Sequence, residues 1–596
     1  MMIEQILINT IHKAIKELYG QEIPCNIAQV QKTREEFEGD YTIVVFPLLK
    51  TSKKGVEQTA EELGKYMVAN LIEVTGYNII KGFLNLSISN VYWLDFFNEN
   101  VGKSNFGSHN QKDTDPVVVE FSSPNTNKPL HLGHIRNNLI GWSVAEILNN
   151  NGQKVARVNL VNDRGIHICK SMVAWQKWGN NNNPENSNIK GDRLVGDYYV
   201  LFDKKNKEEI TSLMADGFTK DEASNSTSLM LESKQMLKDW EDGIEEVREL
   251  WKKMNNWVYK GMDATYARMG ISFDKVYYES ETYLLGKKLV EEGLRSGVFF
   301  QKDDGSVWCD LSEDGLDEKL LIRADGTSVY MTQDIGTAQL RYDDYHPSEL
   351  IYVVGNEQNY HFDVLKLILK KLGKSWADHI RHLNYGMVEL PFGKMKSREG
   401  TVVDADDLID EMYLTAKKTS EELGKFDDFS NDEATELFNM LSMGALKYFI
   451  LKVDPKKTMV FNPVESIDFN GNTGPFIQYT HARIRSIIRK SNQLKINYNL
   501  KFNIDYKFER KEISLLKLLH NYPEITKQAA YSHSPALIAN YAYELAKEYN
   551  QYYHEVVILK EVDENKRNFR ILLSEFTGNN IKSSMALLGI QVPERM

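Results

Sequence analysis

The feature that most constrains the fold is a segment in which a buried strand, a turn and a helix follow one another. Val117 to Phe121 is an apolar, β-branched run that predicts a buried strand, and Ser122-Ser123-Pro124-Asn125 predicts a turn. Apolar residues then recur at helical spacing from Ile135 to Leu148, and a second strand is expected from Val155 to Val161. This order predicts a βαβ unit and therefore a parallel sheet.

A histidine pair, in His131-Leu132-Gly133-His134, lies at the expected start of that helix. Helix N-termini present unpaired N–H groups and a partial positive charge, so they bind phosphate. Two imidazoles three residues apart share one face of the first turn, and Gly133 leaves room for a flat base. Lys128 adds a positive charge for phosphate. The alternatives are two surface histidines or a zinc pair completed by His167.

The longer string around this pair resembles a known family. His131-Leu132-Gly133-His134 is similar to the His-Ile-Gly-His signature of class I aminoacyl-tRNA synthetases. Glu120 to Asn125, followed by Lys128-Pro129, resembles the arginyl-tRNA synthetases in particular. The resemblance implies a multidomain α/β chain with a Rossmann-like parallel-sheet catalytic domain, an N-terminal α+β module and a C-terminal all-α anticodon-binding bundle. It also implies ATP-dependent ligation of L-arginine to its tRNA through arginyl-adenylate, with release of AMP and pyrophosphate.

Composition is compatible with such an enzyme. The chain has 596 residues, enough for three or four domains, and a net charge of −12, which argues against a general nucleic-acid binder. Three scattered cysteines indicate neither a disulfide framework nor a zinc ribbon, and they suit a reducing cytoplasm. We find no signal peptide and no apolar run long enough to span a membrane, and we expect a cytoplasmic monomer.

Four domains are expected along the chain. Residues 1–110 form a small α+β module whose Gly-Asp-Tyr and Gly-Phe-Leu-Asn segments resemble the tRNA-contacting domain of the family. Residues 111–390 form the catalytic domain, in which about 180–262 is a charged helical insertion to which we assign a structural role and no chemistry. Residues 391–455 hold a second signature and connecting helices, and residues 456–596 form the helical anticodon-binding domain.

The resemblance assigns the arginine site. Polar residues at the carboxyl ends of parallel strands are where ligands bind in such sheets. Residues that coincide with arginine-binding positions of the family are Glu120, Asn125, Tyr330, Asp334 and Gln358. The sequence alone gives equal weight to a second interpretation, in which Asp334 is the N-cap of the helix that follows it.

The second signature is Gly393 to Gly400, which resembles a degraded Lys-Met-Ser-Lys-Ser loop, with a basic surface loop as the alternative. The resemblance makes His131, His134, Lys128 and Lys396 catalytic. It assigns ATP binding to His131, Gly133, His134, Lys394, Lys396 and Ser397. Mg²⁺ is expected to arrive with ATP, and no structural metal is expected.

The C-terminal region carries the tRNA expectations. Residues 456–596 hold 20 Lys and Arg against 14 Asp and Glu, a local charge of +6 that favours a polyanion, although chance unevenness is an alternative. Several tyrosines there could stack on unpaired bases, and about half should instead be core. The expected tRNA-binding residues are Tyr479, Arg483, Tyr541, Asn550 and Tyr553.

Two rival interpretations stay open at this point. Another class I synthetase would need features that this chain lacks: the zinc ligands of the cysteinyl enzyme, or the much longer chain of the isoleucyl type. A catalytically inactive relative acting as an RNA-binding module is disfavoured by the intact His131, His134 and Lys396.

Overall fold

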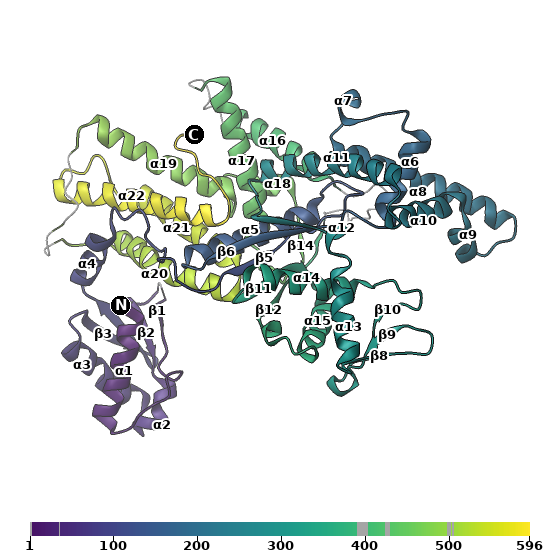
Figure 1. Ribbon diagram of the computed structural model, residues 1–596. Coiled ribbons are helices and arrows are strands. Elements are labelled where there is room, and N and C mark those ends of the chain that lie inside the picture. Colours follow the sequence, from purple (N-terminus) through teal and green to yellow (C-terminus); the bar gives the residue numbers. More distant parts are fainter. Residues whose placement is uncertain (1–2, 35, 390–402, 423–428, 497–501, 503–505) are drawn as a thin grey trace. The chain divides into compact units, whose positions relative to one another are not determined.

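The computed structural model describes residues 3–34, 36–389, 403–422, 429–496, 502 and 506–596 (Figure 1). Its chain separates into two compact units. The first unit combines Met1–Phe106, Arg483–Pro523 and Glu544–Asn580. The second combines Gly107–Ala482, Glu524–Tyr543 and Ile581–Met596, and so holds the histidine pair and the expected arginine site.

The second unit is built on a five-stranded parallel sheet, which confirms the predicted Rossmann-like architecture. Its strands, in spatial order, are β12 (Ile380–Tyr385), β11 (Glu349–Gly355), β5 (Val117–Glu120), β6 (Val155–Val161) and β7 (Lys275–Tyr278). The chain therefore winds from β5 outward to β6 and β7, and later to β11 and β12 on the other side. The winding reverses between β5 and β11, and the carboxyl ends of these two strands flank the crevice where such sheets bind ligands.

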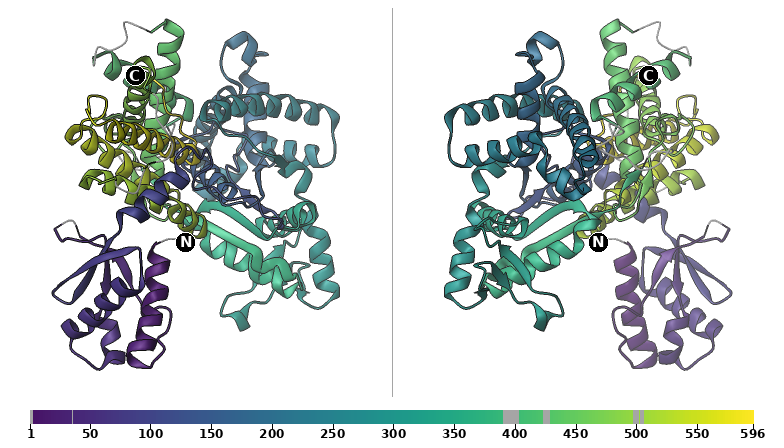
Figure 2. Two further views of the ribbon diagram at one scale, coloured as in Figure 1. Left: turned by 90° about the vertical axis from the view of Figure 1, so that its left-hand side faces the viewer. Right: turned by 90° about the vertical axis from the view of Figure 1, so that its right-hand side faces the viewer.

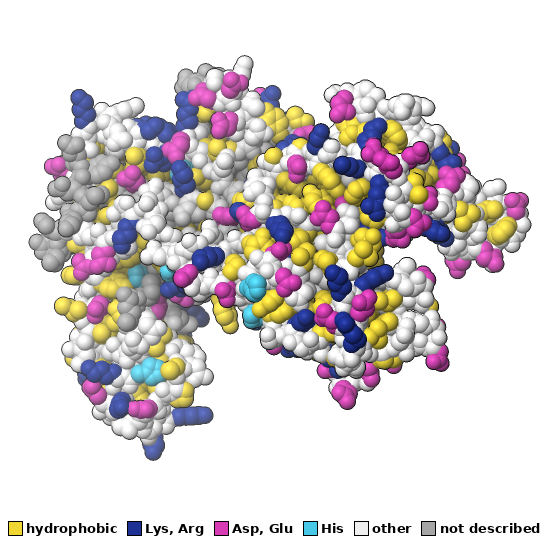
Figure 3. All heavy atoms as spheres, in the orientation of Figure 1, with side chains coloured by type: hydrophobic (Ala, Val, Ile, Leu, Met, Phe, Trp, Pro, Cys, Tyr) yellow, Lys and Arg dark blue, Asp and Glu magenta, His cyan; other side chains and the backbone are white. Residues whose placement is uncertain are grey.

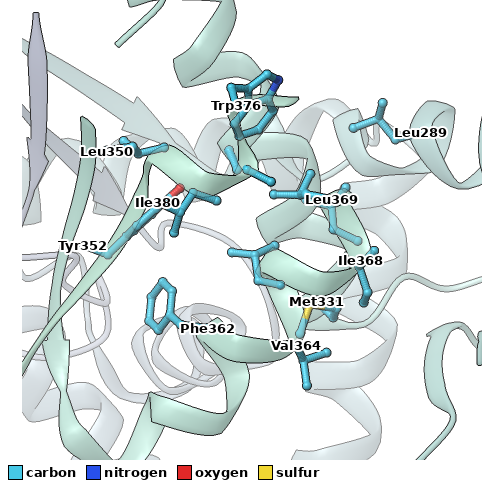
Figure 4. Close-up of a cluster of buried hydrophobic side chains, with 14 of the residues drawn as sticks. Leu289, Met331, Leu350, Tyr352, Phe362, Val364, Ile368, Leu369, Trp376 and Ile380 are labelled. Atoms are coloured by element: carbon cyan, nitrogen blue, oxygen red, sulfur yellow. The ribbon is translucent and has the colours of Figure 1, made fainter. Parts of the chain in front are cut away.

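One face of this sheet is covered by α14 (Tyr330–Tyr345) and α15 (Asn359–Lys371). Figure 4 shows the cluster, in which Tyr352 and Ile380 of the sheet meet Phe362 and Ile368 of α15. Each fully buried side chain of this size stabilises the fold by about 1.5–3 kcal/mol. Strand side chains alternate, so the neighbouring apolar residues face the opposite side, where α5 (Leu132–Asn150) packs on β5, β6 and β11.

The expected insertion is a helical bundle on the second unit (Figure 2). Its main helices are α6 (Ile166–Trp178), α8 (Gly191–Ala215), α10 (Ser228–Glu241) and α11 (Glu245–Met269), with the short α7 (Pro184–Ser187) and α9 (Lys220–Ser226) between them. Helix α8 packs against both α6 and α11. On the face shown in Figure 3, basic and acidic side chains are interspersed over this bundle, and pairs such as Lys177–Glu232 link them.

The second unit contains three further groups of elements. A small antiparallel sheet holds β8 (Phe299–Gln301), β9 (Val307–Cys309) and β10 (Lys319–Ile322). A short parallel pair joins β13 (Val388–Glu389) to β14 (Met459–Val460). Helices α16 (Ala405–Glu422) and α17 (Asn431–Leu451) pack against each other and against α5. These last elements therefore bring residues far along the chain onto the helix that carries the histidine pair.

The first unit begins with an antiparallel sheet in the order β1 (Val30–Lys32), β2 (Tyr41–Val44), β4 (Phe83–Ile88), β3 (Val74–Ile80). Helices α1 (Ile3–Tyr19) and α3 (Val56–Asn70) complete an α+β arrangement. In the same unit Arg570 is buried, and its guanidinium pairs with three carboxylates, those of Glu509, Glu512 and Glu561. This guanidinium therefore links the helix that carries Glu512 to the non-helical segments that hold Glu509 and Glu561.

The C-terminal part of the chain is helical, as predicted. Its helices are α19 (Gly474–Gln493), α20 (Arg510–Ser532), α21 (Pro535–Glu555) and α22 (Glu564–Leu587). None of the helices in the described residues is both long and apolar enough to cross a membrane.

Candidate active site

The two histidines together cap the N-terminus of α5. His131 is the N-cap, and its Nδ1 accepts a hydrogen bond from the N–H of Gly133 at 3.1 Å. His134, in the third helical position, returns the bond: its Nδ1 accepts from the N–H of His131 at 3.2 Å. This is a capping box built from two imidazoles. A Cβ at Gly133 would lie 3.0 Å from the His131 ring, so glycine there makes room for the cap.

The capping box decides which nitrogen of each ring carries the proton. Both Nδ1 atoms accept from backbone N–H groups, so in the neutral rings the proton is on Nε2, which is left as a donor. Burial lowers the pKa of His131 to about 3 and holds that of His134 well below its usual value. Near pH 7 the pair therefore offers two neutral Nε2–H donors instead of two positive charges.

The turn before this helix is held in an unusual conformation. Ser122 and Ser123 have φ of 79° and 45°, in the left-handed region that L-residues rarely adopt. Buried amides stabilise it: the N–H of Ser122 donates to Asn137 Oδ1 at 2.5 Å, and the N–H of Ser123 donates to Asn159 Oδ1 at 2.9 Å. Asn137 also donates to Val353 O at 2.7 Å, so one side chain of α5 ties the carboxyl ends of β5 and β11 together.

A cavity of about 510 Å³ opens beside the cap, lined by Lys128, His131, Asn125 and Tyr330. Burial lowers the pKa of Lys128, and among the described residues no carboxylate pairs with it. Helix α8 forms the opposite wall: a Cβ on Gly196 would lie 2.8 Å from the ring of Pro129, so this helix lies directly on the turn. Helix α8, which belongs to the expected insertion, thus contributes to this cavity, and the structural role expected for the insertion stays a prediction.

Glu120 lies at the carboxyl end of β5 and is buried. Its carboxylate forms an ion pair with the fully buried guanidinium of Arg341, on α14. Burial raises the pKa of Glu120, Arg341 opposes that shift, and Asp334 adds to it. The chain's own arginine thus already occupies one side of the carboxylate expected to bind the substrate, and Asp334 lies close enough to influence it.

Asp334 lies inside α14, whose N-cap is Val329, so the interpretation of Asp334 as a helix cap is wrong. Its Oδ2 lies 2.5 Å from Nε2 of His361, which is on α15. Tyr330 lies one turn earlier on the same helix and is 75 % exposed. Residues four apart share a helix face, so the aromatic ring and the carboxylate are presented together.

Glu279 is a carboxylate that the sequence did not single out. It follows β7 at the same edge of the sheet, and its neighbours include Arg164 at 4.0 Å, Asp163 and Asp334. Burial, against the opposing charge of Arg164, raises the pKa of Glu279 to about 7. A perturbed carboxyl at this edge marks a functional candidate. The available signal was its place directly after the run Val276-Tyr277-Tyr278, which is typical of a strand.

The other expected residues are placed as follows. Asn125 forms an isolated parallel bridge with Asn162, at the ends of β5 and β6. Gln358 is exposed, ends the turn after β11 and precedes α15. Lys394, Lys396 and Ser397 lie outside the described residues. His167, the possible third zinc ligand, lies 3.1 Å from the hydroxyl of Tyr199, and within the described part of the chain no three His, Cys, Asp or Glu side chains converge as metal ligands.

The expected tRNA-binding residues fall into both units. In the first unit Arg483 bonds to Asn550 and stacks on Tyr553, with its guanidinium 4.9 Å from the ring centre. Tyr553 is 40 % exposed. In the second unit Tyr479 is partly buried, while Tyr541 is 5 % exposed, so the expectation that Tyr541 stacks on a base is wrong. Tyr541 belongs to the core because its position on α21 faces inward.

Comparison with known proteins agrees with this geometry. A doubly wound parallel sheet whose switch point carries a His-x-Gly-His cap defines the class I tRNA synthetases. The family model for the catalytic domain of class I (R) tRNA synthetases matches residues 99–462, and that for the DALR anticodon binding domain matches residues 477–596.

The sequence relatives are more specific. The chain is 55 % identical to the arginine–tRNA ligase of Parabacteroides distasonis and 56 % identical to that of Bacteroides thetaiotaomicron, each over 100 % of both chains. The chain belongs to the arginine–tRNA ligase family of class I tRNA synthetases. In fold it is similar to the Thermus thermophilus arginyl-tRNA synthetase, with a TM-score of 0.80 at 24 % identity and 100 % coverage of both chains.

Proposed function

We propose that the crevice between β5 and β11 activates L-arginine with ATP and transfers the arginyl group to tRNA, for protein synthesis. Family membership supports the overall reaction. The observation that carries the site assignment is the pair of neutral Nε2–H donors at the N-terminus of α5. The helix follows β5, whose last residue, Glu120, lies close enough to Asp334 of α14 for Asp334 to raise its pKa. An ATP–pyrophosphate exchange screen over the amino acids, with and without tRNA, tests it: only arginine should support exchange.

The phosphate side of the reaction needs positioning and charge stabilisation. We assign His131 and His134 to the ATP phosphates through Nε2–H, and Lys128 to the developing charge. Gly133, Lys394, Lys396 and Ser397 keep the ATP-binding roles that the family resemblance gives them. Mg²⁺ would arrive with ATP and would offset part of the negative charge of its phosphates.

The arginine side needs acceptors for a planar cation with five N–H donors. We assign the guanidinium of the substrate to Asp334. Glu279 and Glu120, which is paired with Arg341, complete the group of three carboxylates that we call the anionic wall. Tyr330 supplies an aromatic face. Gln358, which follows β11, also contacts the side chain of the substrate, and Asn125, which follows β5, lies near its α-amino end.

Glu279 makes arginine binding depend on pH. With a pKa of about 7 its carboxyl is neutral at pH 6 and ionised at pH 8, so arginine should bind more tightly as pH rises. If binding requires the ionised form, the Kd falls by about tenfold over this range, because the ionised fraction rises from about one eleventh to about ten elevenths. Calorimetric titration of arginine from pH 6 to 8 measures this, and binding near pH 7 should release a proton.

The control for this prediction separates Glu279 from His361, the histidine that contacts Asp334. Glu279→Gln should bind arginine with a Kd that is flat across the range. His361→Asn should keep the wild-type pH dependence, because the titrating carboxyl is still present. A pH dependence that disappears in the His361 variant and persists in the Glu279 variant contradicts the assignment.

Arg483 and Tyr553 are proposed to contact tRNA. A guanidinium stacked on an exposed ring presents both a charge for phosphate and an aromatic face for a base. Tyr553→Ala should weaken tRNA binding by about 1–3 kcal/mol, and Arg483→Gln should also lower the steepness of its salt dependence. Filter binding at several salt concentrations measures both. Tyr552→Phe, at a buried ring, should leave affinity unchanged.

The domain roles follow the same proposal. Residues 1–110 contact the body of the tRNA, 111–390 and 391–455 carry the chemistry, and 456–596 bind the anticodon. We further propose that the chain works as a monomer in the cytoplasm, for which its three free cysteines are suited. Sedimentation of the purified protein tests the monomer.

A further inference from the structure

Arg136 is a fully buried side chain with an unusual set of partners. It lies on α5 two residues after His134 and is 0 % exposed. Its Nη1 donates to the carbonyl of Met387 at 3.0 Å, and its Nη2 donates to those of Pro455 and Lys457 at 3.1 and 2.6 Å. All three acceptors are main-chain oxygens. One side chain thus binds two chain segments that are about 70 residues apart in the sequence.

These carbonyls belong to the residue directly before β13 and to the turn before β14. The carbonyl of Met387 also accepts from the N–H of Met459 at 3.0 Å, and the N–H of Gly386 donates to Pro455 O at 2.9 Å. Val388 pairs with Met459 in the parallel ladder. Arg136 therefore contacts the point at which the two strands of this ladder meet, and it fixes both of them to α5.

The first turn of α5 also holds the segment around residue 404. The N–H of Leu132 donates to Val403 O at 3.2 Å, and the N–H of Ala405 donates to Leu130 O at 2.9 Å. Residues 387–389 and 403–405 are the described residues on either side of the second signature, Gly393 to Gly400, which lies within the range 390–402 outside the described part of the chain. Both flanks are thus bonded to the helix that carries the histidine pair.

Burial of the Arg136 guanidinium costs free energy, which packing alone does not recover. A buried guanidinium loses its hydration, and burial lowers the pKa of Arg136 to about 10. Among the described residues no carboxylate forms an ion pair with it. Even a buried ion pair is often less stable than well-packed apolar side chains, because the lost hydration exceeds the attraction between the charges, and Arg136 bonds to main-chain carbonyls and not to a carboxylate. A planar fork of donors does, however, fix the direction of several carbonyls at once.

We propose that Arg136 is a positioning residue for arginine activation. It fixes the β13–β14 pair against α5, so that the described flanks of the second signature and the histidine donors keep one spacing. Displacement of reacting groups by about 1 Å costs about 100-fold in rate, even when the change is remote from the chemistry. The inference rests on the proposed function, because it deepens the account of the same site.

The test compares Arg136→Lys and Arg136→Met with Ser143→Ala. Ser143 is a matched control, because it is buried on the same helix and donates to a distant main-chain carbonyl, Leu587 O, at 2.7 Å. Exchange of pyrophosphate is measured with tRNA present, together with the KM for arginine and the melting temperature. We expect turnover to fall about 10-fold in the lysine variant and about 100-fold in the methionine variant, with KM for arginine within about twofold. Ser143→Ala should keep wild-type kinetics.

Each outcome decides the proposal. Normal turnover in a folded Arg136→Lys protein overturns it, and so does a rise in the arginine KM that accounts for the whole loss. Failure of both Arg136 variants to fold, judged by circular dichroism, also overturns it, because Arg136 would then be a stability residue. Wild-type protein that shows no arginine-dependent exchange would instead reject the proposed function itself. A turnover loss that is graded from lysine to methionine at constant KM supports positioning.

Discussion

His134→Ala is expected to lower the turnover of arginine-dependent pyrophosphate exchange by about 100- to 1,000-fold, as loss of a preorganised donor to a developing oxyanion does. The Nε2–H of His134 points away from the cap that occupies its Nδ1, and the ring is neutral because burial lowers its pKa. Its contribution should grow as charge develops on the α-phosphate. The KM for arginine should therefore stay near the wild-type value.

The capping role of His134 needs its own control. Alanine also removes the acceptor that satisfies the N–H of His131, which should cost about 1 kcal/mol of stability. His134→Glu restores an acceptor at the third helical position of a capping box, but it offers no donor to phosphate. We expect its melting temperature to recover while turnover stays low. Turnover that recovers with the melting temperature would reduce His134 to a helix cap.

The catalytic core was predictable because its signals are local. The strand at Val117–Glu120 and the helix at Leu132–Asn150 each show in their own periodicity, and a parallel sheet follows from their order. The histidine pair was visible for the same reason: its capping geometry uses residues within one turn. The structure adds the tautomer, which depends on backbone N–H groups whose direction no sequence pattern gives.

The charged partners were not predictable because they are far apart along the chain. Nothing near Glu120 indicates that Arg341 will pair with it, more than 200 residues later. The sequence does not distinguish Arg136 from other polar helix residues, because its partners are main-chain carbonyls between residues 387 and 457. Glu279 is distinguished only by burial beside other carboxylates. Such pairings are set by tertiary packing.

Helical spacing also did not predict which of the C-terminal tyrosines are buried and which are exposed. Tyr541, Tyr549 and Tyr552 are buried, whereas Tyr553 is exposed. The spacing defines which tyrosines share a face of α21, but which face meets other helices depends on how the bundle packs. The same limit applied to Asp334, where an apolar helical pattern suggested a cap and the helix begins a turn earlier.

Asp334→Asn is expected to lower kcat/KM for arginine by a factor that corresponds to about 2–5 kcal/mol, the cost of removing one partner of a charge pair that the bound substrate would bury. An amide keeps the size of the carboxylate but offers one acceptor and adds two donors, which face the donors of the guanidinium. Binding of ATP should stay intact, because the phosphate donors lie on α5. Removal of this negative charge should also lower the pKa values of Glu120 and Glu279, both of which Asp334 raises.

His361 provides the decisive control for this prediction. If Asp334 serves mainly to hold His361, whose Nε2 lies 2.5 Å from it, then His361→Asn should reproduce the kinetic loss of Asp334→Asn. If Asp334 binds the substrate, the His361 variant should keep most of the arginine kcat/KM. Citrulline, which has the shape of arginine without its charge, separates the cases further. A site that pairs a carboxylate with a cation discriminates strongly between the two, so the preference for arginine over citrulline should shrink in Asp334→Asn and persist in His361→Asn.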